Sequence, residues 1–288
     1  MNPALPKNNI LNDIRKKRGY IQGRKGGVNR IEQRFHTLIR QNKKAFIAFI
    51  TAGYPDLSIT RKLVLELAKV GVDIIELGVP FSDPMADGPI IQEASQLALK
   101  RGVNLNDILS LVKSVKKDIN TPIILMTYYN PIFCFGEERF VKKAAACGVD
   151  GIIIPDLPPE EGNSFIRLAN KFNLDTVFFV SPTSTRERIK FVSGISRGFI
   201  YYICLTGVTG PRQNLPKDLV NNLKVIKKLT DKPVCVGFGV SRIEQIRAIY
   251  KIADGVIVGS AIVKKIRENI GKPDLIRKVG KFVSNLMV

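Results

Sequence analysis

Residues 71–91 read GVDIIELGVPFSDPMADGPII, an apolar run with a glutamate near its end, followed by a loop broken by Gly and Pro. The run VDIIEL is apolar on both faces apart from its acids, which is typical of a strand in a parallel sheet covered on both sides. A carboxyl group near the end of such a strand needs a physical reason, because an unpaired buried charge is costly. Glu76, with Asp87 eleven residues later, is therefore the first candidate for chemistry. The alternative is that Glu76 forms an ion pair with Lys or Arg and only stabilises the fold.

Short apolar runs of this kind recur along the chain at fairly even spacing, and segments of helical periodicity separate them. Several of these segments close on Gly, as helices do before a following strand. The eight runs are FIAFIT (46–51), VDIIELGV (72–79), PIILMTYY (122–129), VDGIIIPD (149–156), DTVFFVSP (175–182), GFIYYICL (198–205), KPVCVGFG (232–239) and ADGVIVGS (253–260). Eight strand–helix units predict an α/β fold, a (βα)8 TIM barrel with functional residues on the loops that follow the strands. A doubly wound open sheet is the structural alternative.

The chain is long enough for one such barrel, and we predict a single catalytic domain over residues 29–288. Residues 1–28 are rich in Asn, Lys, Arg and Gly, have little periodic apolar content, and are expected to form a basic, mobile extension. Between the two, residues 30–42 have amphipathic helical spacing, which predicts an extra N-terminal helix over the floor of the barrel.

The net charge of +20 does not indicate a nucleic-acid partner. Residues 1–30 hold eight Lys or Arg against one Asp, and the remaining positive charge is spread over predicted helix faces without aromatic residues for base stacking. An anionic small substrate would also gain from such a field through faster encounter. No run of about 18 apolar residues is present, so no membrane span is expected.

Metal, disulfide and histidine chemistry are not indicated either. The four cysteines lie far apart without a CxxC motif, which offers no zinc site and suits a reducing compartment. The single histidine, His36, lies in the predicted N-terminal helix, away from every strand end. No lysine stands where a Schiff-base nucleophile is expected in the strands. Two carboxyl groups are left for acid–base work, one raised toward neutrality by burial and one kept ionised in a more polar loop.

Glycine-containing motifs after the late strands suggest a phosphate cradle: LTGVTGPRQN, GFGVS and VGSAI. In barrels of this type the loops after the seventh and eighth strands commonly hold a phosphate, with Gly admitting the anion close to backbone N–H groups. Gly237, Gly239, Gly259 and Ser260 are placed for this role. The alternative is that Gly239 and Gly259 only make tight turns between a strand and a helix. The loop at 206–215 is long enough to be a lid that excludes water, or else a plain surface loop.

Taken together, FIAFITAGYP, ELGVPFSDPMADGP, MTYYNPI, IIIPDLPPEE, LTGVTGPR, VGFGVS and VGSAIVK resemble the tryptophan synthase alpha subunit family. The likeness runs in order over residues 30–266, and its ELG-PFSDP-ADGP segment is highly specific. It implies a lyase that cleaves indole-3-glycerol phosphate to indole and glyceraldehyde 3-phosphate without a cofactor. It also implies a beta-subunit partner in an alpha2-beta2 assembly, to which the indole passes.

The resemblance also implies roles for individual residues. Glu76 would be the general acid and Asp87 would accept the indole N–H. Gly210, Gly239, Gly259 and Ser260 match the phosphate contacts. Phe49, Tyr128, Tyr201 and Thr209 match pocket or lid positions, although the three aromatics would also suit a plain core. Asp83, Pro84, Asp156 and Pro158 match segments at the beta-subunit interface, although alone they would be ordinary turn residues.

Other interpretations stay open at this point. Some relatives are stand-alone lyases that release free indole, and the barrel motifs do not exclude that. A non-catalytic binding protein that only activates its partner is an alternative of another class, and it predicts replacement of Glu76 or Asp87. The Lys, Ile and Asn content suggests an AT-rich genome, so a cytoplasmic location is expected, or the plastid stroma if the gene is plastid-encoded.

Overall fold

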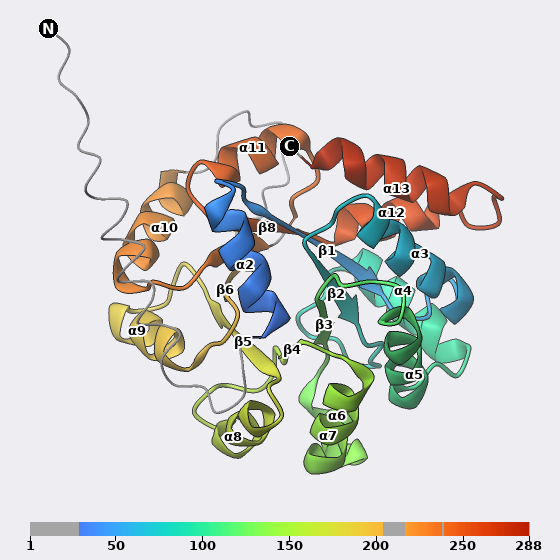
Figure 1. Ribbon diagram of the computed structural model, residues 1–288, viewed down its shortest axis with the longest axis horizontal. Helices are drawn as coiled ribbons and strands as arrows, with labels where there is room; N and C mark the ends of the chain where they lie inside the picture. The colour runs from blue at the N-terminus through green and yellow to red at the C-terminus, as the bar shows by residue number, and fades with distance from the viewer. Residues whose placement is uncertain (1–28, 204–216, 238, 288) are drawn as a thin grey trace, which may run out of the picture.

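The computed structural model describes residues 29–203, 217–237 and 239–287. The predicted extension at 1–28, Thr209 and Gly210 lie outside these residues. Within them, eight parallel strands form a closed barrel in the order β1-β2-β3-β4-β5-β6-β7-β8 (Figure 1). The strands are β1 (Ala45–Thr51), β2 (Ile74–Gly78), β3 (Ile123–Met126), β4 (Gly151–Ile153), β5 (Asp175–Val180), β6 (Ile200–Ile203), β7 (Val234–Gly237) and β8 (Gly255–Val258). The predicted barrel is confirmed, and all eight predicted runs contain a strand.

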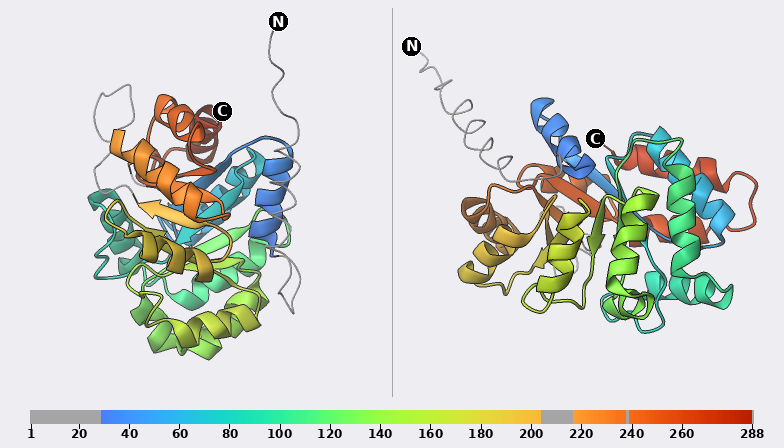
Figure 2. Two further views of the ribbon diagram at one scale, coloured as in Figure 1. Left: turned by 90° about the vertical axis from the view of Figure 1, so that its left-hand side faces the viewer. Right: turned by 60° about the horizontal axis from the view of Figure 1, so that its bottom comes forward.

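The helices lie outside the barrel, as the repeating strand–helix pattern predicts (Figures 1 and 2). They are α3 (Leu57–Lys69), α4 (Pro89–Lys100), α5 (Leu105–Val115), α6 (Tyr129–Phe135), α7 (Glu137–Cys147), α8 (Asn163–Lys171), α9 (Arg186–Ile195), α10 (Lys217–Leu229), α11 (Ile243–Tyr250), α12 (Ser260–Arg267) and α13 (Leu275–Leu286). Glycine ends some of them as expected: Gly148 closes α7 in the left-handed conformation. None of the helices in the described ranges combines the length and apolar character needed to cross a membrane.

The apolar run at 122–129, predicted as one strand, is a strand only in its first part. Strand β3 stops at Met126, and helix α6 already begins at Tyr129. The β3 run continues as apolar and aromatic residues, so periodicity alone does not mark the change. The Tyr129 N–H donates to Asp156 Oδ1 at 2.8 Å, which supplies one of the partners that the first N–H groups of a helix lack. The extra helix therefore depends on a contact from another part of the chain.

The predicted N-terminal helix is present as α2 (Arg30–Arg40), and it covers the floor of the barrel. Asn29 begins it, with its side chain accepting from the Ile31 N–H. Its apolar face, Ile31, Phe35 and Leu38, joins the cluster of residues that fills the barrel interior. Figure 2 shows α2 at the end of the barrel opposite the arrowheads of the strands. The strand carboxyl ends are left to form the open mouth.

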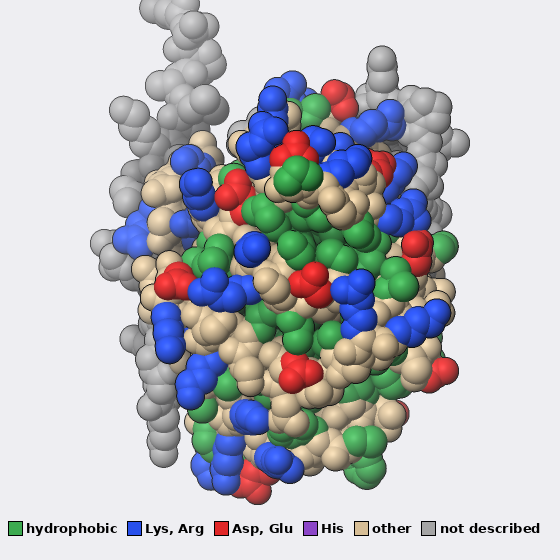
Figure 3. Space-filling view, turned by 90° about the vertical axis from the view of Figure 1, so that its right-hand side faces the viewer, with side chains coloured by type: hydrophobic (Ala, Val, Ile, Leu, Met, Phe, Trp, Pro, Cys, Tyr) green, Lys and Arg blue, Asp and Glu red, His purple; other side chains and the backbone are tan. Residues whose placement is uncertain are grey.

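Two apolar clusters hold the barrel together. The inner one joins α2 to inward-facing residues of the strands, such as Ile47, Ile74 and Ile257, and the outer one lies between the strands and the helices. Strands buried on both faces explain the nearly continuous apolar runs. On the surface, Lys and Arg side chains are scattered among Asp and Glu on the face shown in Figure 3, which agrees with the charge distribution expected from the sequence.

Candidate active site

Strand β2 brings Glu76 to the inner face of the barrel near its mouth. Ile74 belongs to the inner cluster, and because side chains alternate along a strand, Glu76 points to the same side. It pairs in register with Phe49 of β1 and Ile124 of β3. Only 1% of Glu76 is exposed. A carboxyl group is thus held at the centre of an apolar barrel.

Among the residues that the structure describes, the ion-pair interpretation of Glu76 is wrong. Neither of its carboxyl oxygens has a hydrogen-bond partner in the described part of the chain, and none of the ion pairs found there includes it. Desolvation by burial raises the pKa of Glu76 to about 8, and the charge of Asp87 contributes to the rise. Glu76 is therefore protonated at neutral pH, which is the state a general acid requires.

Asp87 reaches the same region from the loop between β2 and α4. Its Oδ2 accepts a hydrogen bond from the Tyr128 hydroxyl at 3.2 Å, and its backbone carbonyl accepts from Gln92 Nε2 at 2.8 Å. Burial raises the pKa of Asp87 to about 6, while the Tyr128 hydrogen bond opposes the rise. At neutral pH Asp87 is therefore largely ionised. The two carboxyl groups differ in protonation at neutral pH, as the sequence predicts, but burial raises the pKa of both, and the Tyr128 hydrogen bond opposes the rise only at Asp87.

Three aromatic residues predicted for the pocket lie buried around this pair. Phe49, Tyr128 and Tyr201 are 4%, 3% and 8% exposed. The charges of Glu76 and Asp87 both act on Tyr201, which places its ring close to them, although desolvation is the main cause of its raised pKa. Burial alone would also suit plain core aromatics. The contact of Tyr128 with Asp87 and the electrostatic coupling of Tyr201 distinguish these two from ordinary core residues.

Two glycines at the carboxyl ends of β2 and β7 leave space for the rings of Phe49 and Tyr201. A Cβ on Gly78 would lie 2.5 Å from the Phe49 ring, and one on Gly237 would lie 2.4 Å from the Tyr201 ring. Gly237 is thus required for the packing of Tyr201, a role that the sequence did not predict. Gly78 was not predicted as a site residue. Its signal was present in the sequence, since it follows Glu76 by two positions and so shares its face.

The described part of the predicted phosphate cradle lies at the ends of β7 and β8. Gly239 has a φ of +71°, a conformation that favours glycine. Gly259 is the N-cap of α12 and Ser260 is its first residue, both partly exposed. N–H groups at the start of a helix lack partners within the helix and suit an anion. A Cβ on Gly259 would also lie 3.2 Å from Phe49, so this glycine serves the packing of the pocket as well.

The four predicted interface residues lie on loops that follow β2 and β4. Asp83 and Pro158 are exposed, while Pro84 and Asp156 are half-buried. Turn roles account for part of the set: the Asp87 N–H donates to the Pro84 carbonyl at 3.2 Å, and Asp156 accepts from the start of α6. Two large apolar side chains, Met85 next to Pro84 and Phe133 in α6, are 81% and 66% exposed.

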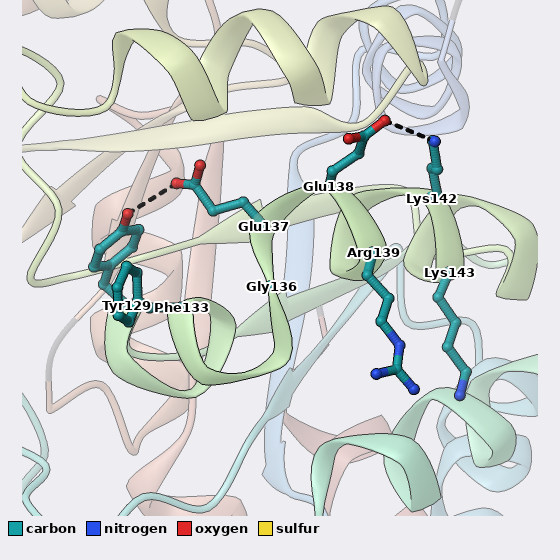
Figure 4. A pocket seen from close by; sticks show the side chains of 8 residues that line it. All are labelled: Tyr129, Phe133, Gly136, Glu137, Glu138, Arg139, Lys142 and Lys143. Atoms are coloured by element: carbon teal, nitrogen blue, oxygen red, sulfur yellow. Dashed lines mark hydrogen bonds and ion pairs between the residues drawn. The ribbon is translucent and has the colours of Figure 1, made fainter.

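A separate surface pocket lies over α6 and α7 (Figure 4). None of the predicted site residues lines it. Its acids already have partners, since Glu137 accepts from the Tyr129 hydroxyl at 2.9 Å and Glu138 pairs with Lys142 at 2.7 Å. The buried, unpaired carboxyl group that chemistry requires is absent from this lining. We therefore place the candidate active site at the barrel mouth.

In the described ranges, no group of three or more His, Cys, Asp or Glu side chains is arranged to hold a metal ion. What the arrangement can do chemically is donate a proton from Glu76 and accept a hydrogen bond or stabilise a positive charge at Asp87.

Several known proteins resemble this chain in sequence and in fold. Residues 35–285 match the family model described as tryptophan synthase alpha chain. The tryptophan synthase alpha chain of Geotalea daltonii is 49% identical over 259 residues, covering 90% of this chain and 98% of that protein. A crystal structure of the alpha subunit from Legionella pneumophila has a TM-score of 0.84 at 37% identity, covering 90% of this chain and 97% of that one. A structure described for mutual activation of the tryptophan synthase a2b2 complex of Pyrococcus furiosus has a TM-score of 0.79 at 40% identity, covering 84% and 97%.

Proposed function

The chain belongs to the tryptophan synthase alpha chain family, and on that premise we propose how its two buried carboxyl groups carry out the family's reaction. The protein is a lyase that acts on indole-3-glycerol phosphate, and its partner is the tryptophan synthase beta subunit. The observation that carries the proposal is the pair itself: Glu76 keeps a proton that Asp87, hydrogen-bonded by Tyr128, has lost. Glu76 lies in a barrel interior with no cation beside it among the described residues.

Cleavage begins with a proton transfer from Glu76. The proton goes to the indole ring carbon that bears the glycerol chain, and the ring becomes a positively charged indolenine. The Asp87 carboxylate accepts the indole N–H and stabilises this charge. The adjacent hydroxyl of the glycerol chain then loses its proton to Glu76 and becomes a carbonyl, while the electrons of the broken carbon–carbon bond return to the ring. Indole and glyceraldehyde 3-phosphate are released, and Glu76 regains its proton.

The remaining predicted residues anchor the substrate and the partner. We assign the phosphate to Gly210, Gly239, Gly259 and Ser260, and the walls and lid of the pocket to Phe49, Tyr128, Tyr201 and Thr209. The proposal for the phosphate is supported by the start of α12 and by the turn at Gly239. We assign Asp83, Pro84, Asp156 and Pro158 to the beta-subunit interface. The reaction is placed in the cytoplasm, or in the plastid stroma if the gene is plastid-encoded.

Indole release from indole-3-glycerol phosphate tests this assignment, measured with and without a beta subunit. The wild-type chain is expected to turn over slowly alone and much faster with the partner. Glu76→Gln and Asp87→Asn should each lower kcat by about 10²–10⁴-fold, the usual contribution of a general acid or base. Both substitutions preserve side-chain shape, so circular dichroism should show folded protein.

The outcomes separate the competing functions. Fast turnover that a beta subunit does not change would indicate a stand-alone lyase. Stimulation of a beta subunit by a chain that releases no indole would indicate a non-catalytic activator, and would return Glu76 to a structural role. Full activity in both variants would remove the two-carboxylate mechanism.

A further inference from the structure

Tyr128 has a contact with Asp87 that its assignment to the pocket wall does not explain. The Tyr128 hydroxyl donates to Asp87 Oδ2 at 3.2 Å and accepts from the Ala86 N–H at 2.9 Å. We propose that Tyr128 is a positioning residue, which holds the Asp87 carboxylate in place and leaves its Oδ1 for the indole N–H. This inference rests on the proposed function and extends it to a residue that does not itself exchange a proton.

The two hydrogen bonds fix the direction in which the hydroxyl donates. A tyrosine hydroxyl has one proton. Because the hydroxyl oxygen already accepts the Ala86 N–H, that proton is free to point at Asp87 Oδ2. A carboxylate is a better acceptor than a carboxylic acid, so the contact favours the ionised form of Asp87. Within the described ranges no residue donates to Asp87 Oδ1.

Tyr128 is itself held rigidly, as a positioning residue must be. Its side chain is 3% exposed, and its ring stacks on Phe81 with centroids 5.1 Å apart. Its backbone is the N-cap of α6, whose first N–H is bound by Asp156. Phe81 and Ala86 lie in the same loop as Asp87, so the ring and the hydroxyl together fix that loop against β3 and α6. The hydroxyl position is thus set by several contacts that do not involve Asp87.

The charged and titratable groups around Asp87 come from four elements. Glu76 of β2 faces Asp87, and the charge of Asp87 contributes to the raised pKa of Tyr201 in β6 and of Tyr128. Asp156, after β4, acts on Tyr128. Burial raises the pKa of Asp87, and the Tyr128 hydrogen bond is the opposing influence. Because the charge of Asp87 in turn raises the pKa of Glu76, one hydroxyl influences both members of the pair.

The pH profile of kcat tests the role of Tyr128 with the full chain and the beta subunit. The wild type is expected to lose activity below about pH 6, where Asp87 takes up a proton, and above about pH 8, where Glu76 loses its own. In Tyr128→Phe the acid limb should move up by about one pH unit, and kcat at pH 6.5 should fall about threefold. KM should stay within about twofold, because the ring and its stacking remain.

Two further variants separate a specific role from general damage. Tyr129→Phe is the matched control: it is the adjacent tyrosine, its hydroxyl donates to Glu137, and it should leave the pH profile unchanged. A fluorinated tyrosine placed at position 128 keeps the shape and makes the hydroxyl a stronger donor. It should move the acid limb down, opposite to Tyr128→Phe. A merely structural role for Tyr128 predicts no such reversal.

A direct titration keeps this test separate from the test of the reaction. Carbon-13 NMR of the carboxyl groups, assigned with Asp87→Asn, should show a higher midpoint for Asp87 in Tyr128→Phe than in the wild type. This measurement needs no activity. An inactive wild type with that shift would defeat the proposed function and leave the contact intact. An active wild type whose acid limb and Asp87 midpoint are the same in Tyr128→Phe would overturn the positioning role.

Discussion

Strand β2 follows one buried acid, Asp73, and contains another, Glu76, and the surroundings of the two acids are opposite. Asp73, just before the strand, accepts hydrogen bonds from Arg34 and from the Phe46 N–H. Desolvation raises the pKa of Asp73, and these two donors oppose the rise. Glu76, three residues further, has no partner on either carboxyl oxygen in the described part of the chain. An acidic residue thus holds neighbouring parts of the chain together at the floor of the barrel, and an acidic residue is available for chemistry at its mouth.

Two further aspartates at the floor, Asp150 and Asp254, follow the pattern of Asp73. Asp150, before β4, binds Arg30 at 2.5 Å, Lys116 at 3.2 Å and the Ile123 N–H at 2.8 Å. Asp254, before β8, accepts from a lysine and from the N–H that begins β7. Each aspartate therefore joins its own strand to a neighbouring one. At the floor, charge is buried with its counter-charge, whereas at the mouth it is buried alone and shifts its pKa.

The largest expected effect on stability comes from breaking the floor at Asp150. Asp150→Ala leaves Lys116, only 7% exposed at its side chain, without its counter-ion and leaves the Ile123 N–H unpaired. Loss of one partner of a buried ion pair should lower the free energy of unfolding by about 3–5 kcal/mol. Urea denaturation measures this. Asp118→Ala breaks the exposed pair with Arg61 and should cost less than about 1 kcal/mol. Equal losses in the two variants would contradict the view that the floor carries a stabilising charge network.

A substitution at the mouth, Glu76→Gln, should raise the free energy of unfolding, whereas Asp150→Ala at the floor should lower it. Glu76 has a folded-state pKa raised from 4.5 to about 8, so its stabilising contribution is complete below about pH 4.5 and is lost as pH rises toward 8. Glu76→Gln cannot ionise. Relative to the wild type it should therefore gain about 2–4 kcal/mol in free energy of unfolding between pH 5 and pH 8.

Denaturation curves at pH 5, 6, 7 and 8 would measure the difference between Glu76→Gln and the wild type. Glu161→Gln, on the surface, serves as the control and should follow the wild type across the range. A difference that does not change with pH would show that Glu76 is solvated, and the contrast between the two ends of the barrel would disappear.

The smallest effect is expected at the rim of the floor. Lys227→Ala removes one of the two lysines that pair with Asp254, and its side chain is 38% exposed. Lys44 and the Val234 N–H remain. The free energy of unfolding should fall by less than about 1 kcal/mol, and by less still in high salt. A loss as large as that of Asp150→Ala would show that the exposure of an ion pair does not determine how much it stabilises the fold.

Predictability from the sequence also differs between the two ends. Each acid at the floor is the last residue of a short GVD or AD motif that precedes a strand. The cations that pair with these acids are distant in sequence and come from α2, from the end of α5 and from α10. At the mouth, Glu76 and Asp87 were found from their own segment. The contact of Tyr128 with Asp87 was not, because it depends on where β3 ends and α6 begins. The position of Gly78 on the face of Glu76 could be seen in the sequence, but its need to be glycine could not, because that depends on the ring of Phe49.

The sequence by itself determined the strand–helix repeat, the barrel, the N-terminal helix over its floor and the two carboxyl groups. These follow from periodicity and from chemistry within short segments, which are local properties. The tertiary structure decided which acids are paired and which are alone, and so which of them keep a proton. Burial and counter-charge depend on side chains that arrive from other strands and helices, and no local pattern records them. For Glu76, that arrangement turns a glutamate in a strand into an acid at neutral pH.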